Sequence, residues 1–342
     1  MNNCKNCGGE VVFTPKVRGN TCANCGSVFA TEYVYKFVKK PIAESYNLES
    51  STYEKNSKSL KCDSCGATMV LNKLQTQSSC PYCGNTSVIE SRRKKLMAID
   101  SVIPFSFSKQ EAFNKFKHTL HSKFYANTKP FRGISLKNVA GVYVNSFVFD
   151  MATTSSYSGV FSYTKTTKDK DGNTKHETVH KAVHGVHKGV FKNVTIESNS
   201  HIEQSDLYSI MPFNFASAVE FKEDFMNGYL LEYENTKFDD CVNKAERIVK
   251  NRIENELLRE HNCDRIVSLT LNTNYVEKKY NYCLLPFYLF SNVYKNTKYT
   301  SLMNGQTGKV GKLPTNIWKV LLTVFLICGF IVGIILLVLF LR

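Results

Sequence analysis

The sequence predicts an α+β protein with two small Cys4 zinc ribbons, a mixed α/β body with antiparallel strands, and one C-terminal transmembrane helix. Three observations predict this fold class: a duplicated cysteine pattern near the N-terminus, alternating helix-like and strand-like periodicity in the centre, and an uncharged apolar run at the end. The predicted segments are zinc ribbon 1 at 1–30, a polar linker at 31–57, zinc ribbon 2 at 58–91, the α/β body at 96–313 and the transmembrane anchor at 317–342.

The composition indicates a folded protein with an anionic partner. The chain has 342 residues, of which 43% are hydrophobic, so it can bury a core and is not a disordered chain. Its formal net charge of +15 suits nucleic acid, an anionic lipid surface or an acidic protein. The start of the chain, Met1–Cys7, lacks the apolar stretch of a signal peptide. We therefore expect the N-terminal thiols to lie in a reducing compartment and to serve as metal ligands.

The first structural element is a cysteine unit that occurs twice. In each unit a C-x-x-C pair is followed after 14 residues by a second pair, and the two units are offset by 58 residues. A glycine closes every pair, because a tight turn favours a residue without a Cβ. Two facing pairs bring four thiolates to one point, the tetrahedral arrangement typical of structural zinc. The predicted ligands of two zinc ions are Cys4, Cys7, Cys22, Cys25, Cys62, Cys65, Cys80 and Cys83.

Disulfides and an iron–sulfur cluster are the alternatives for these cysteines. The duplicated spacing and the closed sets of four favour structural zinc. An ion with four thiolate ligands has no open position for water, so neither site is predicted to be catalytic. Four further cysteines follow no pattern, and we expect them in the core or the membrane: Cys241, Cys263, Cys283 and Cys328.

Polar and basic segments flank the second ribbon. The run Ser51–Ser59 indicates a linker between the ribbons. The basic run Arg92–Lys95 follows the second ribbon, and such a run either contacts phosphates or forms a solvated hinge. We favour the solvated hinge, because charge runs are usually exposed.

The body alternates helical and strand-like patterns. Ser108 and Glu111 form a capping box that opens a helix with apolar residues on one side, namely Ala112, Phe113, Phe116 and Leu120. A second helix is predicted at Phe238–His261. The predicted strands are Val139–Phe149, Val160–Thr164, Thr178–Val190, Ile266–Asn272, Tyr275–Leu285 and Tyr288–Tyr294. Hairpin turns are expected at Asp171-Gly172 and Asn304-Gly305.

Two patterns resemble functional motifs. The first is the histidine set His176, His180, His184 and His187, for which we favour solvent-facing side chains over a ligand set, because only Glu177 is an evident acidic neighbour. The second, Gly305–Lys309, resembles a phosphate-binding loop, but its glycines are too close together and no hydroxyl residue follows the lysine. With no other catalytic motif evident, the chain is predicted not to be an enzyme.

The last element is an apolar run at Val320–Leu341 that contains no charge. As a helix it spans roughly 33 Å, enough for a hydrocarbon core of about 30 Å. Lysines before the run, with Trp318 as an interfacial anchor, predict a single-pass cell-membrane protein with a cytoplasmic N-terminus. Gly329 and Gly333 permit close approach of two such helices, although we favour the interpretation that they are ordinary membrane-helix glycines.

Taken together, the two C-x-x-C-G ribbons, the helix after Val102–Phe105, the Asn304–Lys309 turn and the terminal span resemble a known family. It comprises bacterial membrane-anchored proteins with double zinc ribbons of the transcription-factor-IIB or primosomal type. The resemblance implies a link to the phage-shock envelope stress response. It also implies recruitment of a phage-shock protein A homologue alongside a flotillin-like (SPFH) protein.

These observations lead to two expected functions. The first is a non-enzymatic adaptor or scaffold that recruits cytosolic partners to membrane lipid, as part of envelope stress response or membrane maintenance. The alternative is a membrane-tethered nucleic-acid-binding zinc-ribbon protein, which the basic charge also suits. Lipid-modifying chemistry through the histidine set is a third possibility.

Overall fold

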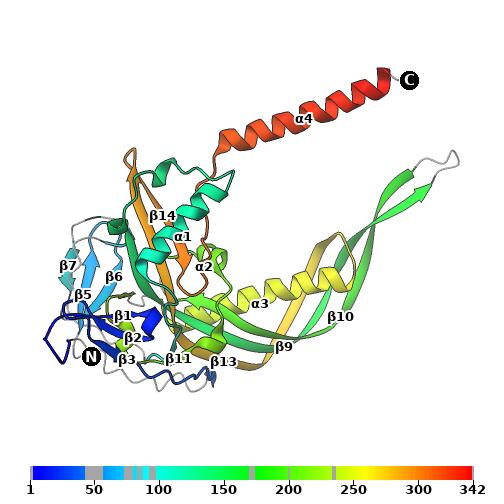
Figure 1. Ribbon diagram of the computed structural model, residues 1–342. Coiled ribbons are helices and arrows are strands. Elements are labelled where there is room, and N and C mark those ends of the chain that lie inside the picture. The colour runs from blue at the N-terminus through cyan, green and yellow to red at the C-terminus, as the bar shows by residue number, and fades with distance from the viewer. Residues whose placement is uncertain are drawn as a thin grey trace.

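The computed structural model shows a body at one end, a long projecting arm and a separate C-terminal helix (Figure 1). It describes residues 3–42, 57–72, 80–82, 85, 88–91, 98–168, 174–198, 201–232 and 236–340. The described strands form a 3-stranded sheet near the N-terminus and an 11-stranded mixed sheet through the rest of the molecule. The predicted combination of cysteine clusters, a mixed α/β body and a terminal apolar helix is therefore confirmed.

Helices and strands alternate along the chain. The strands are β1 Val11–Thr14, β2 Gly19–Cys22, β3 Val28–Ala30, β4 Lys40–Pro41, β5 Ser57–Cys62, β6 Thr68–Asn72, β7 Val88–Ser91, β8 Ser101–Val102, β9 Val139–Lys168, β10 Thr174–Glu197, β11 Val219–Glu220, β12 Leu230–Glu232, β13 Arg265–Tyr294 and β14 Thr297–Asn304. The α-helices are α1 Lys109–Ser122, α2 Gln204–Ile210, α3 Phe238–Glu260 and α4 Ile317–Phe340.

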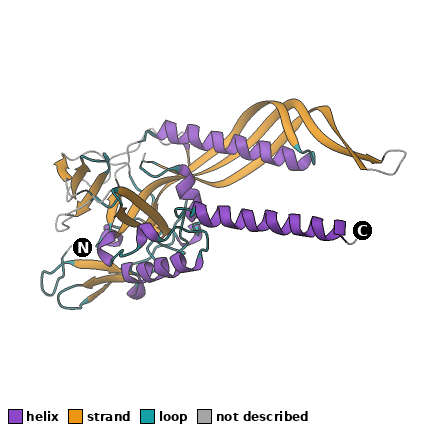
Figure 2. Cartoon of the chain, turned by 90° about the horizontal axis from the view of Figure 1, so that it is seen from above, coloured by secondary structure: helices purple, strands orange, loops and turns teal. Residues whose placement is uncertain are grey.

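Three long strands, β9, β10 and β13, run through the centre of the main sheet. β9 pairs antiparallel with β10 on one side and with β13 on the other. In the body these strands carry buried aromatic and aliphatic side chains on both faces. Beyond the body, the same strands continue as the arm, which comprises residues 150–168, 174–192 and 265–279 together with α3 (Figures 1 and 2).

The sheet is covered on both faces because side chains alternate along each strand. Tyr143 joins the core cluster that includes α1, whereas its neighbours Val142 and Val144 join the cluster that includes α2. Along the arm, α3 covers one face with its buried residues Cys241, Val242, Ala245, Val249, Ile253 and Leu257. The opposite face of the arm has no helix over it among the described residues.

The predicted elements of the body are largely confirmed. Helix α1 begins with the Ser108–Glu111 capping box, and its buried residues are the four predicted ones. Helix α3 begins at the predicted Phe238. The predicted strands at Val160–Thr164 and Thr178–Val190 are paired, with Val160 opposite Ala182.

Other details differ from the prediction. The three strands predicted between Ile266 and Tyr294 are one strand, β13, whose register shifts near Tyr275 where a bulge occurs. Pro286 does not end this strand; its carbonyl accepts a bond from Gly305 N at 2.7 Å. The last hairpin turns at Lys295-Asn296, both with positive φ, and the expected reversal at Asn304-Gly305 follows it.

Several sequence predictions lie outside the described residues. These are the Asp171-Gly172 turn, most of the Ser51–Ser59 linker and the Arg92–Lys95 run. The predicted domain boundaries likewise remain predictions. Residues 38–42 lie against the body, where Lys40–Pro41 pairs with β13.

The C-terminal helix α4 extends from the body as an isolated element (Figures 1 and 2). Its segment Ile317–Leu336 is long and apolar enough to cross a membrane, and none of that segment is buried in the protein. An exposed apolar surface of this size is unfavourable in water, so the helix needs a cover that the described chain does not provide.

Candidate metal centres and the adjoining pocket

The first cysteine cluster lies at one end of the small sheet. The Sγ atoms of Cys4 and Cys25 are 3.5 Å apart, as are those of Cys7 and Cys22. All four sulfur atoms lie within 4.8 Å of one another. The edge of a zinc–thiolate tetrahedron with bonds of about 2.3 Å measures about 3.8 Å, so these four residues can hold a metal ion of that kind.

Each half of the cluster is a tight knuckle. Cys4 N donates to Gly9 O at 2.8 Å, and Gly8 N donates to Cys4 O at 2.9 Å. The turn places Gly8 at φ 74° and Gly26 at φ 73°, a left-handed conformation that glycine adopts without strain. The predicted role of the closing glycines is therefore visible in the backbone.

Local hydrogen bonds lower the pKa of two exposed thiols, those of Cys7 and Cys25. Contacts with the Ser27 hydroxyl and then its backbone lower the pKa of Cys25 to about 6. The backbone N–H of Gly9, followed by the Asn24 amide, lowers the pKa of Cys7. A lower thiol pKa favours the thiolate, which is the form that binds metal.

The second cluster contains three described cysteines, Cys62, Cys65 and Cys80. The Sγ atoms of Cys65 and Cys80 are 3.6 Å apart. Cys62 N donates to Ala67 O, and Cys80 N donates to Asn85 O, both at 2.8 Å, so each repeats the first bond of the ribbon 1 knuckle. The fourth predicted ligand, Cys83, lies outside the described residues.

Ribbon 1 is attached to the body by one buried aromatic ring, that of Phe13, and by a series of hydrogen bonds between polar side chains. Phe13 packs edge-on against Phe225 with ring centroids 5.3 Å apart and belongs to the body's core cluster. Asn227 Nδ2 donates to Asn20 Oδ1 at 2.8 Å. Asn20 Nδ2 in turn donates to Thr31 Oγ1 at 3.0 Å. The cysteines Cys4 and Cys22 form a separate small cluster, so the metal side of ribbon 1 stays apart from the body core.

Ribbon 2 is attached more deeply. Its strand β6 pairs with β12, which places it in the main sheet. Cys62 and Cys80 belong to the same buried cluster as α2 and the central strands. Ser291 Oγ also donates to Pro81 O at 2.7 Å, so the second knuckle is fastened to β13. The metal side of ribbon 2 is therefore part of the body core.

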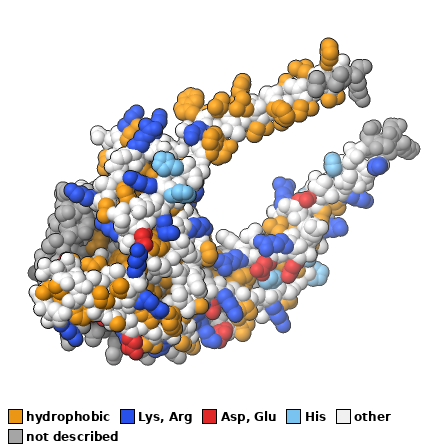
Figure 3. Space-filling view, viewed as in Figure 1, with side chains coloured by type: hydrophobic (Ala, Val, Ile, Leu, Met, Phe, Trp, Pro, Cys, Tyr) orange, Lys and Arg blue, Asp and Glu red, His pale blue; other side chains and the backbone are white. Residues whose placement is uncertain are grey.

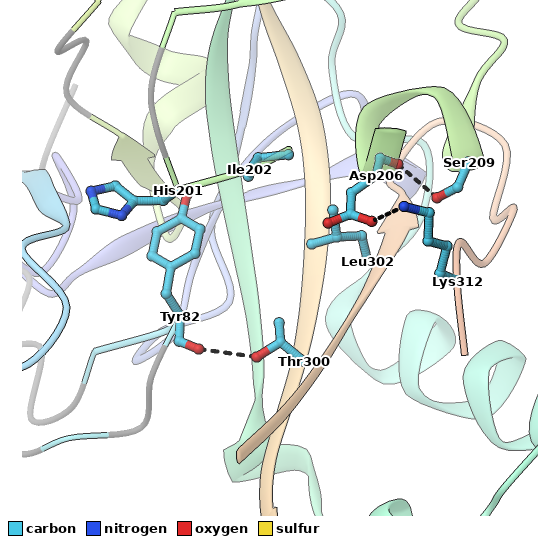
Figure 4. A pocket seen from close by; sticks show the side chains of 8 residues that line it. All are labelled: Tyr82, His201, Ile202, Asp206, Ser209, Thr300, Leu302 and Lys312. Atoms are coloured by element: carbon cyan, nitrogen blue, oxygen red, sulfur yellow. Dashed lines mark hydrogen bonds and ion pairs between the residues drawn. The ribbon is translucent and has the colours of Figure 1, made fainter. Parts of the chain in front are cut away.

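A pocket of about 160 Å³ lies between ribbon 2, α2 and β14 (Figure 4). On the ribbon side Tyr82 lies beside His201, with ring centroids 5.8 Å apart. On the other side Lys312 Nζ pairs with Asp206 Oδ1 at 2.9 Å. Thr300 Oγ1 donates to Tyr82 O at 3.0 Å and links the ribbon to β14.

The polar groups of this pocket mainly hold the structure together. Burial, followed by the charge of Glu232, raises the pKa of Tyr82 well above its ordinary value, so the phenol is neutral at physiological pH. Asp206 and Lys312 neutralise each other, and Ser209 Oγ donates to Asp206 O at 2.6 Å. The volume is smaller than typical ligand pockets, which occupy about 300–1,000 Å³. We therefore interpret this pocket as a structural contact between ribbon 2 and the segment that leads to α4.

The histidine set does not form a single group. His176, His180 and His184 are exposed, as predicted, on the arm face opposite α3. The prediction is wrong for His187, which is buried with its Nε2 at 3.0 Å from Glu256 Oε2. The acidic partner belongs to α3, far away in sequence, so the local pattern did not reveal it.

The remaining cysteines fit their expected places. Cys241 and Cys283 are buried, Cys263 is half-buried and Cys328 lies on α4. Sequence reasoning missed Glu197, a carboxylate buried at the end of β10 whose Oε2 has no hydrogen-bond partner within the described structure. Burial raises its pKa to about 7. The apolar surroundings of a carboxylate give no signal in the local sequence.

Comparison with known proteins adds one relative. The chain is similar to the "Uncharacterized protein YdjG" of Bacillus subtilis (strain 168), with 23% identity over 322 residues. The match covers 93% of this chain and 91% of that protein. No protein-family model and no solved structure matches the chain.

Proposed function

We propose that this protein is a non-enzymatic, membrane-anchored adaptor that holds cytosolic proteins close to a lipid bilayer. In this proposal α4 crosses the membrane once, the N-terminal part lies in the cytoplasm, and two structural zinc ions stabilise the ribbons. The basic flank before α4 supports this orientation, because positively charged residues favour the cytoplasmic side. Thiolate-only sites at tetrahedral spacing support zinc as the ion.

The observation that carries the proposal is the arm. One face is covered by α3, whereas the other presents many exposed side chains on all three strands. These exposed residues include Ser156, Ser158, His180, His184, Val186, Val190, Thr270 and Asn272. This three-stranded surface carries hydroxyl, imidazole and valine side chains. Such side chains can form hydrogen bonds and small apolar contacts with the surface of another protein.

The arm remains outside the membrane in this arrangement. In Figures 1 and 2, α4 extends in nearly the same direction as the arm. Exposed lysines along the arm, such as Lys181 and Lys188, exclude it from the hydrocarbon layer that α4 fills. The body contacts α4 at its first turn, where Lys319 Nζ donates to Phe124 O, but none of the segment Ile317–Leu336 is buried. We infer that α4 changes its direction relative to the arm on entering the bilayer.

Crosslinking in native membranes tests the adaptor function. We expect the full-length protein to capture cytosolic proteins, with a phage-shock protein A homologue and a flotillin-like protein as the first candidates to examine. Replacing Val186→Glu and Val190→Glu together should reduce that capture at least about tenfold, because two buried charges oppose docking.

A matched control separates docking from general effects of charge. Val293 is an exposed valine of β13 that lies outside the arm, so Val293→Glu should leave the captured set unchanged. Capture that survives both arm substitutions would remove the arm from recruitment. An empty captured set from the wild-type protein would contradict the adaptor proposal itself.

A membrane-tethered nucleic-acid binder is the second candidate. It is favoured by the net charge of +15 and by lysines along the arm, including Lys181 over the ring of Tyr163 at 4.9 Å. Binding to phosphates must weaken steeply as salt rises, because counterions are released. A filter-binding titration against salt that shows flat, weak retention would reject this candidate.

A further inference from the structure

A loop of the body is fastened to the foot of the C-terminal helix. The loop comprises residues 123–127, directly after α1, and we call it the foot loop. Asn127 N donates to Pro314 O at 2.7 Å, and Asn316 N donates to Tyr125 O at 2.8 Å. Ala126 also forms a β-bridge with Thr315. These backbone bonds hold the foot loop beside the first turn of α4.

The foot loop exposes aromatic rings at this position. The side chain of Phe124 is 64% exposed, and Phe124 packs edge-on against Tyr125. Trp318, on the first turn of α4, is 81% exposed. Lys319 Nζ donates to Phe124 O at 2.9 Å and lies 4.8 Å from the centroid of the Phe124 ring. Aromatic and lysine side chains together at the end of a membrane helix are typical of the membrane–water interface.

The two chain segments that meet at this point carry basic residues and no acidic ones. The segments 112–149 and 278–342 contain no Asp or Glu, and they meet where the foot loop contacts the chain before α4. At the contact itself the basic residues are Lys123, Lys312 and Lys319, of which Lys312 is paired with Asp206. Figure 3 shows basic and histidine side chains gathered where the apolar helix leaves the body. Such a surface attracts anionic lipid headgroups.

A cavity of about 360 Å³ opens between the two segments. Lys123, Phe124 and Tyr125 line one side, and residues 311–315 line the other. Lys312 is engaged with Asp206, so Lys123 supplies the cation that is available at the rim. The volume is within the range of small-molecule sites, and a phosphate ester is a chemical match for a lysine beside an aromatic wall.

We propose that the foot loop docks onto the bilayer, with Phe124 and Tyr125 in the interface and an anionic phospholipid headgroup in the adjoining cavity. Lys123 binds the lipid phosphate at the cavity, and Lys319, beside Phe124, adds positive charge next to it. This proposal rests on the membrane anchoring that the adaptor function requires. It adds a specific lipid site that fixes the orientation of the body on the membrane surface.

Tryptophan quenching in vesicles tests the position of the loop. Trp318 is the single tryptophan of the chain, so its emission reports the insertion of α4. A second protein, with Phe124→Trp and Trp318→Phe, reports the foot loop. Both full-length proteins are reconstituted in vesicles that contain lipids brominated on the acyl chain near the headgroup. We expect the tryptophan at each position to be quenched.

The two tryptophans distinguish the two proposals. If Trp318 is quenched and the tryptophan at position 124 is not, the foot-loop proposal is overturned while the anchor stands. If neither is quenched, α4 is not inserted, and the membrane-anchored adaptor fails together with the foot-loop site. Thermal unfolding of both proteins checks that the substitutions leave the fold intact.

The lipid preference is measured with the same tryptophan at position 124. The association constant obtained from quenching by brominated phosphatidylglycerol should be at least roughly fivefold higher than that for brominated phosphatidylcholine. A factor of about five corresponds to the attraction of one lysine to an anionic membrane surface. Lys123→Gln with Lys319→Gln should reduce this ratio to about one, while Lys250→Gln on α3, as a matched control, leaves it unchanged. Equal quenching by both lipids, or relief by inorganic phosphate at constant ionic strength, would overturn the lipid site.

Discussion

The two ribbons have the same cysteine spacing, yet the structure attaches them differently. Ribbon 1 inserts one ring, Phe13, into the body and keeps Cys4 and Cys22 in a cluster of their own. Ribbon 2 joins the main sheet through β6 and places Cys62 and Cys80 inside the body core. A metal-binding pattern therefore fixes the local knuckle, whereas the residues between the knuckles decide what the ribbon stabilises.

The largest expected effect comes from removing the metal side of ribbon 2. Cys62→Ser with Cys80→Ser should remove one zinc ion per chain. It should also lower the melting temperature of the full-length protein in detergent by at least about 10 °C, because polar hydroxyls would replace metal-bound sulfur in the core. Elemental analysis and thermal unfolding measure the two effects.

The same substitutions in ribbon 1 provide the control. Cys4→Ser with Cys22→Ser should also remove one zinc ion, but the body should melt within about 5 °C of the wild type, because these cysteines lie outside its core. Equal losses of melting temperature for the two pairs would show that the ribbons are equivalent.

The attachment of ribbon 1 depends on Phe13. Phe13→Ala should weaken docking by about 3–5 kcal/mol, because the ring is deleted from a packed aromatic site. Hydrogen exchange of β1 and β2 should rise while both zinc ions stay bound. Phe29→Ala, which removes a ring packed within the ribbon's own cluster, is the matched control. Loss of zinc from the Phe13 variant would contradict a purely structural docking role.

The face of the sheet that meets ribbon 2 also contains Glu197, paired in register with Ser146. Burial raises the pKa of Glu197 from 4.5 to about 7, so between these values the folded protein holds a proton that the unfolded chain has released. Stability should therefore fall as pH rises through that window. Glu197→Gln should abolish this slope and add up to about 3 kcal/mol above pH 7.

Denaturant unfolding at several pH values measures this effect. The exposed carboxylate of Glu177 serves as the comparison, and Glu177→Gln should leave the slope as it is in the wild type. An unchanged slope in the Glu197 variant would mean that another group controls the pH dependence.

The smallest expected effect concerns one hydrogen bond at the ribbon 2 knuckle. Ser291→Ala removes the bond to Pro81 O and should cost about 1 kcal/mol. Hydrogen exchange near Cys80 should increase modestly, and zinc content should stay the same. A large loss of stability would indicate that the knuckle depends on this bond more than on sheet pairing.

Sequence reasoning succeeded where the signal is local. The Ser108 capping box gave the start of α1 and its buried face, because the cap and the apolar spacing lie within one helix. The strands around Val160 and Ala182 were predicted as partners because the turn signal Asp171-Gly172 lies between them in the sequence. It failed for β13, which was predicted as the three strands Ile266–Asn272, Tyr275–Leu285 and Tyr288–Tyr294, because the continuous pairing with β9 comes from a segment far away in the chain.

Prediction from the sequence also failed where segments far apart in the chain meet. His187 is buried because α3 brings Glu256 to it, and the foot loop is held because residues 314–316 return to it. The absence of Asp and Glu from segments 112–149 and 278–342 was visible in the sequence. Its meaning depended on knowing that the two segments lie side by side.

The cysteine knuckles, the capped helix and the apolar span can be predicted from local sequence, because each depends on residues close together in the chain. Three other features could be seen only in the folded protein: the burial of the ribbon 2 cysteines in the core, the burial of Glu197, and the position of the foot loop beside α4. These features arise from pairing between segments far apart in the chain, where burial and contact depend on the whole fold.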